Sequence, residues 1–76
     1  MIKIYGKPSC PFCTQAKQLA EQQGLDHVYL TLDVDYTRED LMQLVPNART
    51  VPQIFVNESL IGGYNEFETF VKQNGV

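Results

Sequence analysis

The only two cysteines of this 76-residue sequence stand close together, in the segment Cys10-Pro11-Phe12-Cys13. Such a pair serves as a structural disulfide, as part of a metal site or as a redox dithiol. Cross-linking so short a loop removes little unfolded-state entropy, roughly 2 kcal/mol, and structural disulfides are rare in the cytosol. Structural zinc takes four ligands, whereas the chain adds only His27 to the two thiols. The pair is therefore predicted to be a redox dithiol, with the other two uses as alternatives.

The position of Cys10 ahead of a predicted helix favours its thiolate form. Pro11 suits the first helical position, which makes Cys10 the N-cap. Its sulfur can then accept hydrogen bonds from the N–H groups of Phe12 and Cys13. The positive end of the helix dipole and the charge of Lys7 act in the same direction. We therefore expect Cys10, exposed at the helix tip, to attack a disulfide, and Cys13, inside the first turn, to resolve the mixed disulfide.

Hydrophobic patterns place this pair at the start of the first helix of an α/β domain. We predict helices over residues 11–24, 37–45 and 65–74, and strands over residues 2–5, 28–34, 52–56 and about 60–61. A helix joins the first two strands, so they are parallel with a right-handed crossover. The turn between the last two is too short for a crossover, so they are antiparallel. The order β-α-β-α-β-β-α predicts a mixed four-stranded sheet with helices on both faces.

Each predicted helix carries one apolar stripe that is expected to be buried. The stripes are Phe12, Ala16, Leu19 and Ala20 in the first helix, Leu41, Leu44 and Val45 in the second, and Phe67, Phe70 and Val71 in the third. Gly24 is expected to cap the end of the first helix, and Thr37 the start of the second. We interpret the tyrosines at positions 5, 29 and 36 as packing or surface residues.

Length and composition limit the classes of function. The chain is expected to form one domain over residues 1–76. Its 43% hydrophobic and 20% charged residues are typical of a globular protein. A net charge of −3, with scattered basic residues, argues against a nucleic-acid partner. No apolar run is long enough to cross a membrane, and no signal-peptide pattern precedes the first strand. We therefore expect a monomer in the cytoplasm.

Three motifs together resemble the glutaredoxin family within the thioredoxin fold. They are Cys10-Pro11-Phe12-Cys13, similar to the Cys-Pro-Tyr/Phe-Cys site, Thr50-Val51-Pro52-Gln53-Ile54-Phe55, similar to the segment with the cis-proline, and Gly62-Gly63-Tyr64, similar to the glycine pair before the last helix. Their order and spacing also match, so the resemblance covers essentially the whole chain. The nearest likeness is to the small dithiol glutaredoxins of bacteria and phages. The resemblance implies a thioredoxin-like fold, a thiol–disulfide oxidoreductase, and glutathione as co-substrate without a tightly bound cofactor or metal.

The resemblance also implies a set of site residues. Cys10 and Cys13 are catalytic, and the glutathione-binding residues are Lys7, Phe12, Thr50, Val51, Pro52, Gly63, Tyr64, Asn65 and Glu66. A cis Pro52 turns the Val51 backbone toward glutathione, which pairs with it like a short added strand. The N-terminus of the last helix, behind the glycines, suits the γ-glutamyl carboxylate. The alternatives are an edge strand that begins at Pro52 and a plain turn at the glycines.

Some positions depart from the family pattern. Phe12 stands at a position where the family often has Tyr, and it lacks the tyrosine hydroxyl. Asn65 replaces Ser, Thr or Asp and can still cap a helix, whereas Glu66 replaces an Asp that contacts the glutathione amino group. Lys7 and Arg49 are candidates for attracting glutathione carboxylates, with a solvated surface position as the alternative for Arg49.

The function implied is reduction of protein disulfides and of glutathione mixed disulfides, with ribonucleotide reductase as a typical client in the family. One alternative is a reductant served by thioredoxin reductase, against which the glycine pair and the Thr50-Val51-Pro52 segment weigh. Another is an iron–sulfur cluster carrier that bridges a dimer through Cys10 and glutathione. Relatives of that kind tend to have one active-site cysteine followed by Gly-Phe-Ser, so Cys13 and Pro11 argue against it. A non-catalytic binding module would leave the activation of Cys10 unexplained.

Overall fold

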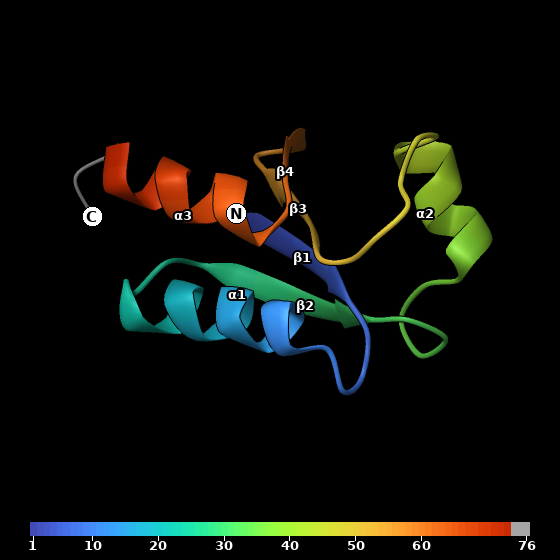
Figure 1. The fold of residues 1–76 in the computed structure, drawn as a ribbon, viewed down its shortest axis with the longest axis horizontal. Coiled ribbons are helices and arrows are strands. Elements are labelled where there is room, and N and C mark those ends of the chain that lie inside the picture. Colours follow the sequence, from blue (N-terminus) through green and yellow to red (C-terminus); the bar gives the residue numbers. More distant parts are fainter. Residues whose placement is uncertain (74–76) are drawn as a thin grey trace.

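A four-stranded sheet forms the centre of the computed structural model, which describes residues 1–73 (Figure 1). The strands are β1 (Ile2–Gly6), β2 (His27–Thr31), β3 (Gln53–Val56) and β4 (Ser59–Gly62), and the helices are α1 (Pro11–Gln22), α2 (Arg38–Leu44) and α3 (Tyr64–Gln73). The strand order is β2-β1-β3-β4, with β1 and β2 parallel and the other pairs antiparallel. The predicted element order and mixed sheet are confirmed. Asn74, the predicted end of the last helix, lies outside the described residues.

Helices cover both faces of this sheet. α1 and α3 pack against each other on one face (Figure 1), and α2 packs on the other face, where Leu41 lies with Tyr5 and Phe55. The larger core, under α1 and α3, contains Ile2, Ile4, Ala16, Ala20, Ile54, Phe67 and Val71. The smaller core, under α2, contains Tyr36, Leu41 and Val45. Within residues 1–73, no helix has the length and apolar character that a membrane span requires.

The predicted ends of the helices rest on local hydrogen bonds. Gly24 follows α1 with a φ of +64°, and its N–H donates to the Glu21 carbonyl oxygen at 3.1 Å, which confirms it as the terminating residue. Thr37 and Asp40 form a capping box at the start of α2, in which each side-chain oxygen accepts the other residue's N–H. These local bonds are the kind of signal that sequence alone carries.

The predicted stripe of α1 was wrong at Phe12. The Phe12 side chain is 56% exposed, and the residue that lies with Ala16 and Ala20 on the buried face is Cys13, which is fully buried. Spacing explains the shift, since Ala16 and Cys13, four and seven positions before Ala20, share its side of the helix. Burial of Cys13 takes its thiol out of solvent.

Two further predictions failed at the ends of elements. β2 ends at Thr31 because the Asp35 carboxylate accepts the Thr31 N–H at 2.8 Å and the chain turns at Asp33, which has a φ of +64°. Val34, predicted as part of this strand, is therefore 78% exposed. Leu44 is also exposed, because α2 is short and buries only the side of the helix that carries Leu41.

Candidate active site

The N-terminus of α1 positions the two thiols next to each other. Cys10 has the extended backbone of an N-cap, and its sulfur accepts the Cys13 N–H at 3.3 Å. This is one of the two donors predicted for it. Both cysteines are free thiols. The first turn of the helix thus holds Cys13 beside the Cys10 sulfur and directs an N–H dipole at that sulfur.

Cys10 is less exposed than predicted, with only 7% of its surface accessible. The loop before β3 covers it, and the Cys10 thiol donates to the Val51 carbonyl oxygen at 3.8 Å. This contact joins residues 41 positions apart in the chain, so no local pattern reveals it.

Cys13 lies deeper and is a poor thiolate in the resting protein. Burial raises the pKa of the Cys13 thiol from its ordinary 9.0 to about 11, and a hydrogen bond with Cys10 adds to the increase. Hydrogen bonds from the Lys7 backbone and from Tyr29 act in the opposite direction and lower that pKa. At neutral pH Cys13 is therefore a protonated thiol beside Cys10.

This shift predicts a loss of stability in alkali. The unfolded chain releases the Cys13 proton near pH 9.0, while the folded protein keeps it to about pH 11. Because the unfolded state binds fewer protons between these values, the free energy of unfolding should fall as the pH rises from 9 to 11, by on the order of 2 kcal/mol. Urea titrations of the reduced protein at several pH values measure this slope.

The matched control is Cys13→Ala, which should have a flatter slope over the same range. Burial also raises the pKa values of Tyr29 and Tyr36, each to about 12, so both proteins should lose stability at higher pH. Equal slopes for the two proteins between pH 9 and 11 would show that Cys13 is not the group responsible.

A groove of about 340 Å³ runs beside the cysteine pair. It is lined by Phe12, Thr50, Val51, Pro52, Gly63, Tyr64, Asn65 and Glu66. These are all the residues expected to bind glutathione except Lys7, and they come from the start of α1, the loop before β3 and the start of α3. The Val51–Pro52 peptide bond is cis, as predicted. The fold thus brings together three segments that are distant in the sequence.

The α3 end of the groove differs from the expectation. Because α3 begins at Tyr64, Asn65 lies inside the first turn and not at the cap. The Glu66 carboxylate accepts the Gly63 N–H at 2.8 Å, which is one of the donors expected for a ligand carboxylate. Glu66 thus makes the same contact, to the N–H three residues before it, that Asp40 makes at the start of α2. A ligand at this end of the groove therefore meets a carboxylate.

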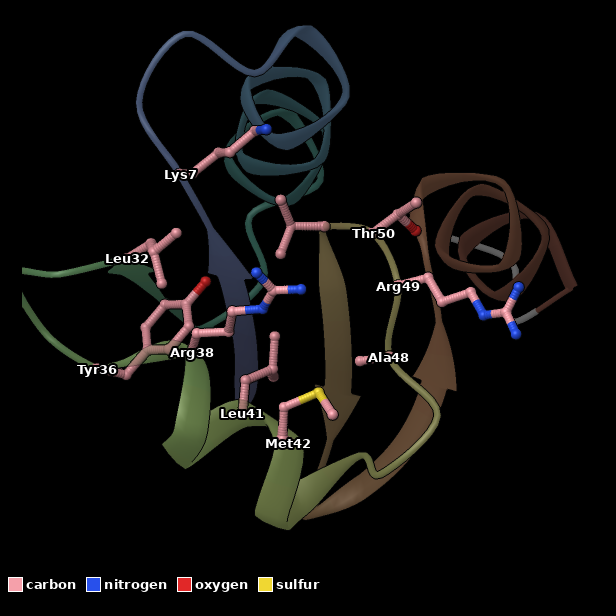
Figure 2. Close-up of a pocket in the computed structure, with 10 residues that line it drawn as sticks. Lys7, Leu32, Tyr36, Arg38, Leu41, Met42, Ala48, Arg49 and Thr50 are labelled. Atoms are coloured by element: carbon pink, nitrogen blue, oxygen red, sulfur yellow. The ribbon is translucent and has the colours of Figure 1, made fainter.

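A second cavity, of about 250 Å³, lies on the other side of the Thr50–Val51 segment, between α2 and the sheet. Lys7, Arg38 and Arg49 are among its lining residues, and no carboxylate is. Within residues 1–73 none of these three cations forms a salt bridge. Figure 2 shows the Arg38 guanidinium in the middle of the cavity, whereas the Arg49 side chain points away from it.

Arg38 is the charged residue that sequence reasoning missed. It is the first residue of α2, at the positive end of the helix dipole, where a cation is unfavourable. A basic residue at the start of a predicted helix was the feature of the sequence that could have identified Arg38. Together with Lys7, Arg38 gives the cavity next to Val51 a positive potential that would attract an anion.

Comparisons with known proteins agree with this geometry. The sequence model of the family Glutaredoxin matches residues 2–61. Glutaredoxin 1 of Escherichia coli is 42% identical over 93% of this chain and 92% of its own length. The structure of reduced Escherichia coli glutaredoxin superposes with a TM-score of 0.82 at 39% identity, over 96% of this chain and 94% of that one.

A plant relative adds a structure with a ligand. A complex of buckwheat glutaredoxin with glutathione matches with a TM-score of 0.78 at 26% identity, over 97% of this chain and 69% of that one. The family match, the curated relative and the shared fold lead to the same conclusion as the paired thiols beside a groove. The chain belongs to the glutaredoxin family of thiol–disulfide oxidoreductases.

Proposed function

We propose that this oxidoreductase uses glutathione to reduce glutathione mixed disulfides and protein disulfides. The observation that supports this most is the groove itself, because one of its lining residues is Val51, whose carbonyl oxygen lies 3.8 Å from the Cys10 sulfur. A tripeptide that pairs with the Val51 backbone would bring its own sulfur to Cys10. The buckwheat relative in complex with glutathione supports the same ligand.

The lining of the groove suits the parts of glutathione. Phe12 and Tyr64, with ring centroids 6.2 Å apart, form an apolar wall. Glu66 places a negative charge where the amino group of the γ-glutamyl residue would lie. At the opposite end, Lys7 and Arg38 in the neighbouring cavity offer positive charge for the glycine carboxylate. Charges of opposite sign at the two ends would fix the direction of the bound peptide.

The proposed reaction has two exchanges. The Cys10 thiolate attacks a disulfide sulfur, a new S–S bond forms, and the other sulfur leaves with the electron pair of the broken bond and takes up a proton. In the second exchange either glutathione or Cys13 attacks the mixed disulfide on Cys10. If Cys13 does so, an internal disulfide forms, and two molecules of glutathione reduce it while they are oxidised to glutathione disulfide.

One experiment tests the dependence on glutathione. The protein turns over a glutathione mixed disulfide with NADPH, first with glutathione and glutathione reductase and then with thioredoxin reductase as the source of electrons. We expect rapid turnover in the first system and little in the second. The reverse result would favour a reductant served by thioredoxin reductase.

Clients and cellular setting belong to the same proposal. We propose protein disulfides as clients, among them that of ribonucleotide reductase, which the family resemblance implies. We also propose that the protein acts as a monomer in the cytoplasm, where glutathione keeps thiols reduced. Support of ribonucleotide reductase turnover by the purified protein and glutathione, and a sedimentation measurement of its mass, test these statements.

Glu66→Gln is expected to raise the KM for the glutathione substrate about two- to fivefold, with little change in kcat. Gln keeps an oxygen that can accept the Gly63 N–H but loses the charge proposed to meet the ligand amino group, and such exposed charge pairs contribute up to about 1 kcal/mol. Steady-state kinetics measure both constants. Glu21→Gln, on the exposed surface of α1, is the matched control. An unchanged KM in Glu66→Gln would exclude this contact.

A further inference from the structure

Tyr29 places a hydroxyl behind the cysteine pair, away from the groove. It belongs to β2 and packs against the core under α1. Its hydroxyl donates to the Lys7 carbonyl oxygen at 3.2 Å. A Cβ atom on Gly6 would lie only 2.4 Å from this hydroxyl oxygen and 3.0 Å from the Cys13 Cβ. The bare backbone of Gly6 therefore leaves the space in which the Tyr29 hydroxyl and Cys13 meet.

The ring of Tyr29 is held in place on its other side. The Lys17 ammonium group lies 5.5 Å from the ring centroid, and the ring itself packs on the core. Rotation of the hydroxyl proton, which needs no movement of the ring, is enough to redirect the donor from the Lys7 carbonyl oxygen to a neighbouring acceptor. Tyr29 is thus more than the packing residue expected from the sequence.

A hydrogen-bond donor next to Cys13 would stabilise its thiolate during the reaction. Cys13 is fully buried, yet it must carry a negative charge when it attacks a mixed disulfide and again when it leaves the internal disulfide. A buried anion is costly without hydrogen bonds. The groups that act on the Cys13 thiol are Cys10, the Lys7 backbone and Tyr29. Of these, Tyr29 is the only side-chain oxygen donor.

We propose that Tyr29 is a positioning residue for the Cys13 thiolate, its hydroxyl turning from the Lys7 carbonyl to the Cys13 sulfur as the thiol loses its proton. The inference rests on the resolving role proposed above for Cys13. In that step the Cys13 sulfur bonds to Cys10, and the bond between Cys10 and the substrate sulfur breaks. The substrate sulfur departs with the electron pair and takes up the proton that Cys13 lost.

Tyr29 donates a hydrogen bond in this step but gives up no proton. Burial raises the pKa of its hydroxyl to about 12, and the neighbouring Cys13 adds to the increase. The proton therefore stays on the phenol oxygen at neutral pH. The same hydrogen bond would stabilise the Cys13 thiolate in both directions of the exchange.

Tyr29→Phe tests this role, because it removes the hydroxyl and keeps the ring. Tyr5→Phe is the matched control. Tyr5 lies on the adjacent strand β1, and it packs on the smaller core, on the opposite face of the sheet. In the Cys10→Ser background, the pH dependence of alkylation by iodoacetamide reports the pKa of Cys13. We expect Tyr29→Phe to raise this pKa and Tyr5→Phe to leave it unchanged, a difference that altered packing alone would not produce.

The second readout is the resolving step itself. Wild-type and variant proteins react with one equivalent of glutathione disulfide, and the release of the second glutathione is followed in a single turnover. Loss of a hydrogen bond to a charged group should slow this release about tenfold or more in Tyr29→Phe. In the Cys13→Ser background, Tyr29→Phe should leave the glutathione-only cycle unchanged.

The outcomes separate this inference from the proposed function. If Cys13→Ser impairs the reduction of protein disulfides but Tyr29→Phe changes neither the pKa of Cys13 nor the release of glutathione, the role of Tyr29 is wrong and that of Cys13 stands. If Cys13→Ser leaves that reduction intact, both are wrong.

Discussion

Cys10→Ser is expected to reduce both activities, on glutathione mixed disulfides and on protein disulfides, to the uncatalysed level. Cys13→Ser is expected to keep most of the first activity and to lose at least about a hundredfold of the second. The two cysteines differ in this way because the Cys10 sulfur contacts Val51, a residue that lines the groove, whereas Cys13 is fully buried.

The reaction steps explain why the two activities divide. A glutathione mixed disulfide needs one nucleophile, since free glutathione can complete the cycle. A protein disulfide leaves Cys10 joined to a client that still holds its own second thiol nearby. Cys10 is released from the client fastest when the second attack is intramolecular. The effective molarity of a thiol positioned next to Cys10 far exceeds a millimolar concentration of free glutathione. Cys13, whose N–H already binds the Cys10 sulfur, is so positioned.

Both assays on both variants, at matched glutathione concentrations, measure this division. Circular dichroism should first establish that each variant is folded. Equal loss of both activities in folded Cys13→Ser would show that Cys13 does more than resolve the mixed disulfide on Cys10. A more active Cys10→Ser than Cys13→Ser would mean that the two roles are reversed.

Those parts of the fold that depend on neighbours in the sequence could be predicted. The N-cap at Cys10, the N-cap at Thr37 and the terminating Gly24 each rest on a few adjacent residues, and the structure shows all three. The topology followed from the lengths of the connections. The family resemblance supplied the cis bond before Pro52.

The predictions that failed concerned features that depend on contacts between distant segments. Phe12 was expected in the core because a phenylalanine at helical spacing is normally buried, but Cys13 occupies that place. Cys10 was expected at an exposed tip, but the loop at Val51 covers it. The position of Arg38 over the second cavity depends on how α2 lies on the sheet, and a hydrophobic pattern carries no information about that.

The glycine pair before α3 makes the last strong prediction, because a side chain at Gly62 would disturb both fold and groove. Gly62 has a φ of +123°, a backbone conformation that residues other than glycine rarely adopt. A Cβ there would lie 2.8 Å from Cγ and from Oε1 of Glu66. Gly62→Ala should therefore lower the free energy of unfolding by roughly 2–4 kcal/mol and raise the KM for the glutathione substrate several-fold, since Glu66 must move away from the Gly63 N–H.

Gly24→Ala is the matched control for this substitution. Gly24 also has a positive φ, of +64°, but apart from the glycine itself and its two chain neighbours no atom of residues 1–73 lies within 4 Å of the position of its Cβ. It should therefore show only the backbone cost of a left-handed residue, about 1–2 kcal/mol, with an unchanged KM. Urea denaturation and steady-state kinetics on both variants separate the two effects. Because the three atoms nearest to the new Cβ all belong to Glu66, the double variant Gly62→Ala, Glu66→Ala should recover the part of the stability lost to the collision and keep the part lost to the backbone. A double variant no more stable than Gly62→Ala would mean that the backbone conformation, and not the contact with Glu66, makes glycine necessary at this position.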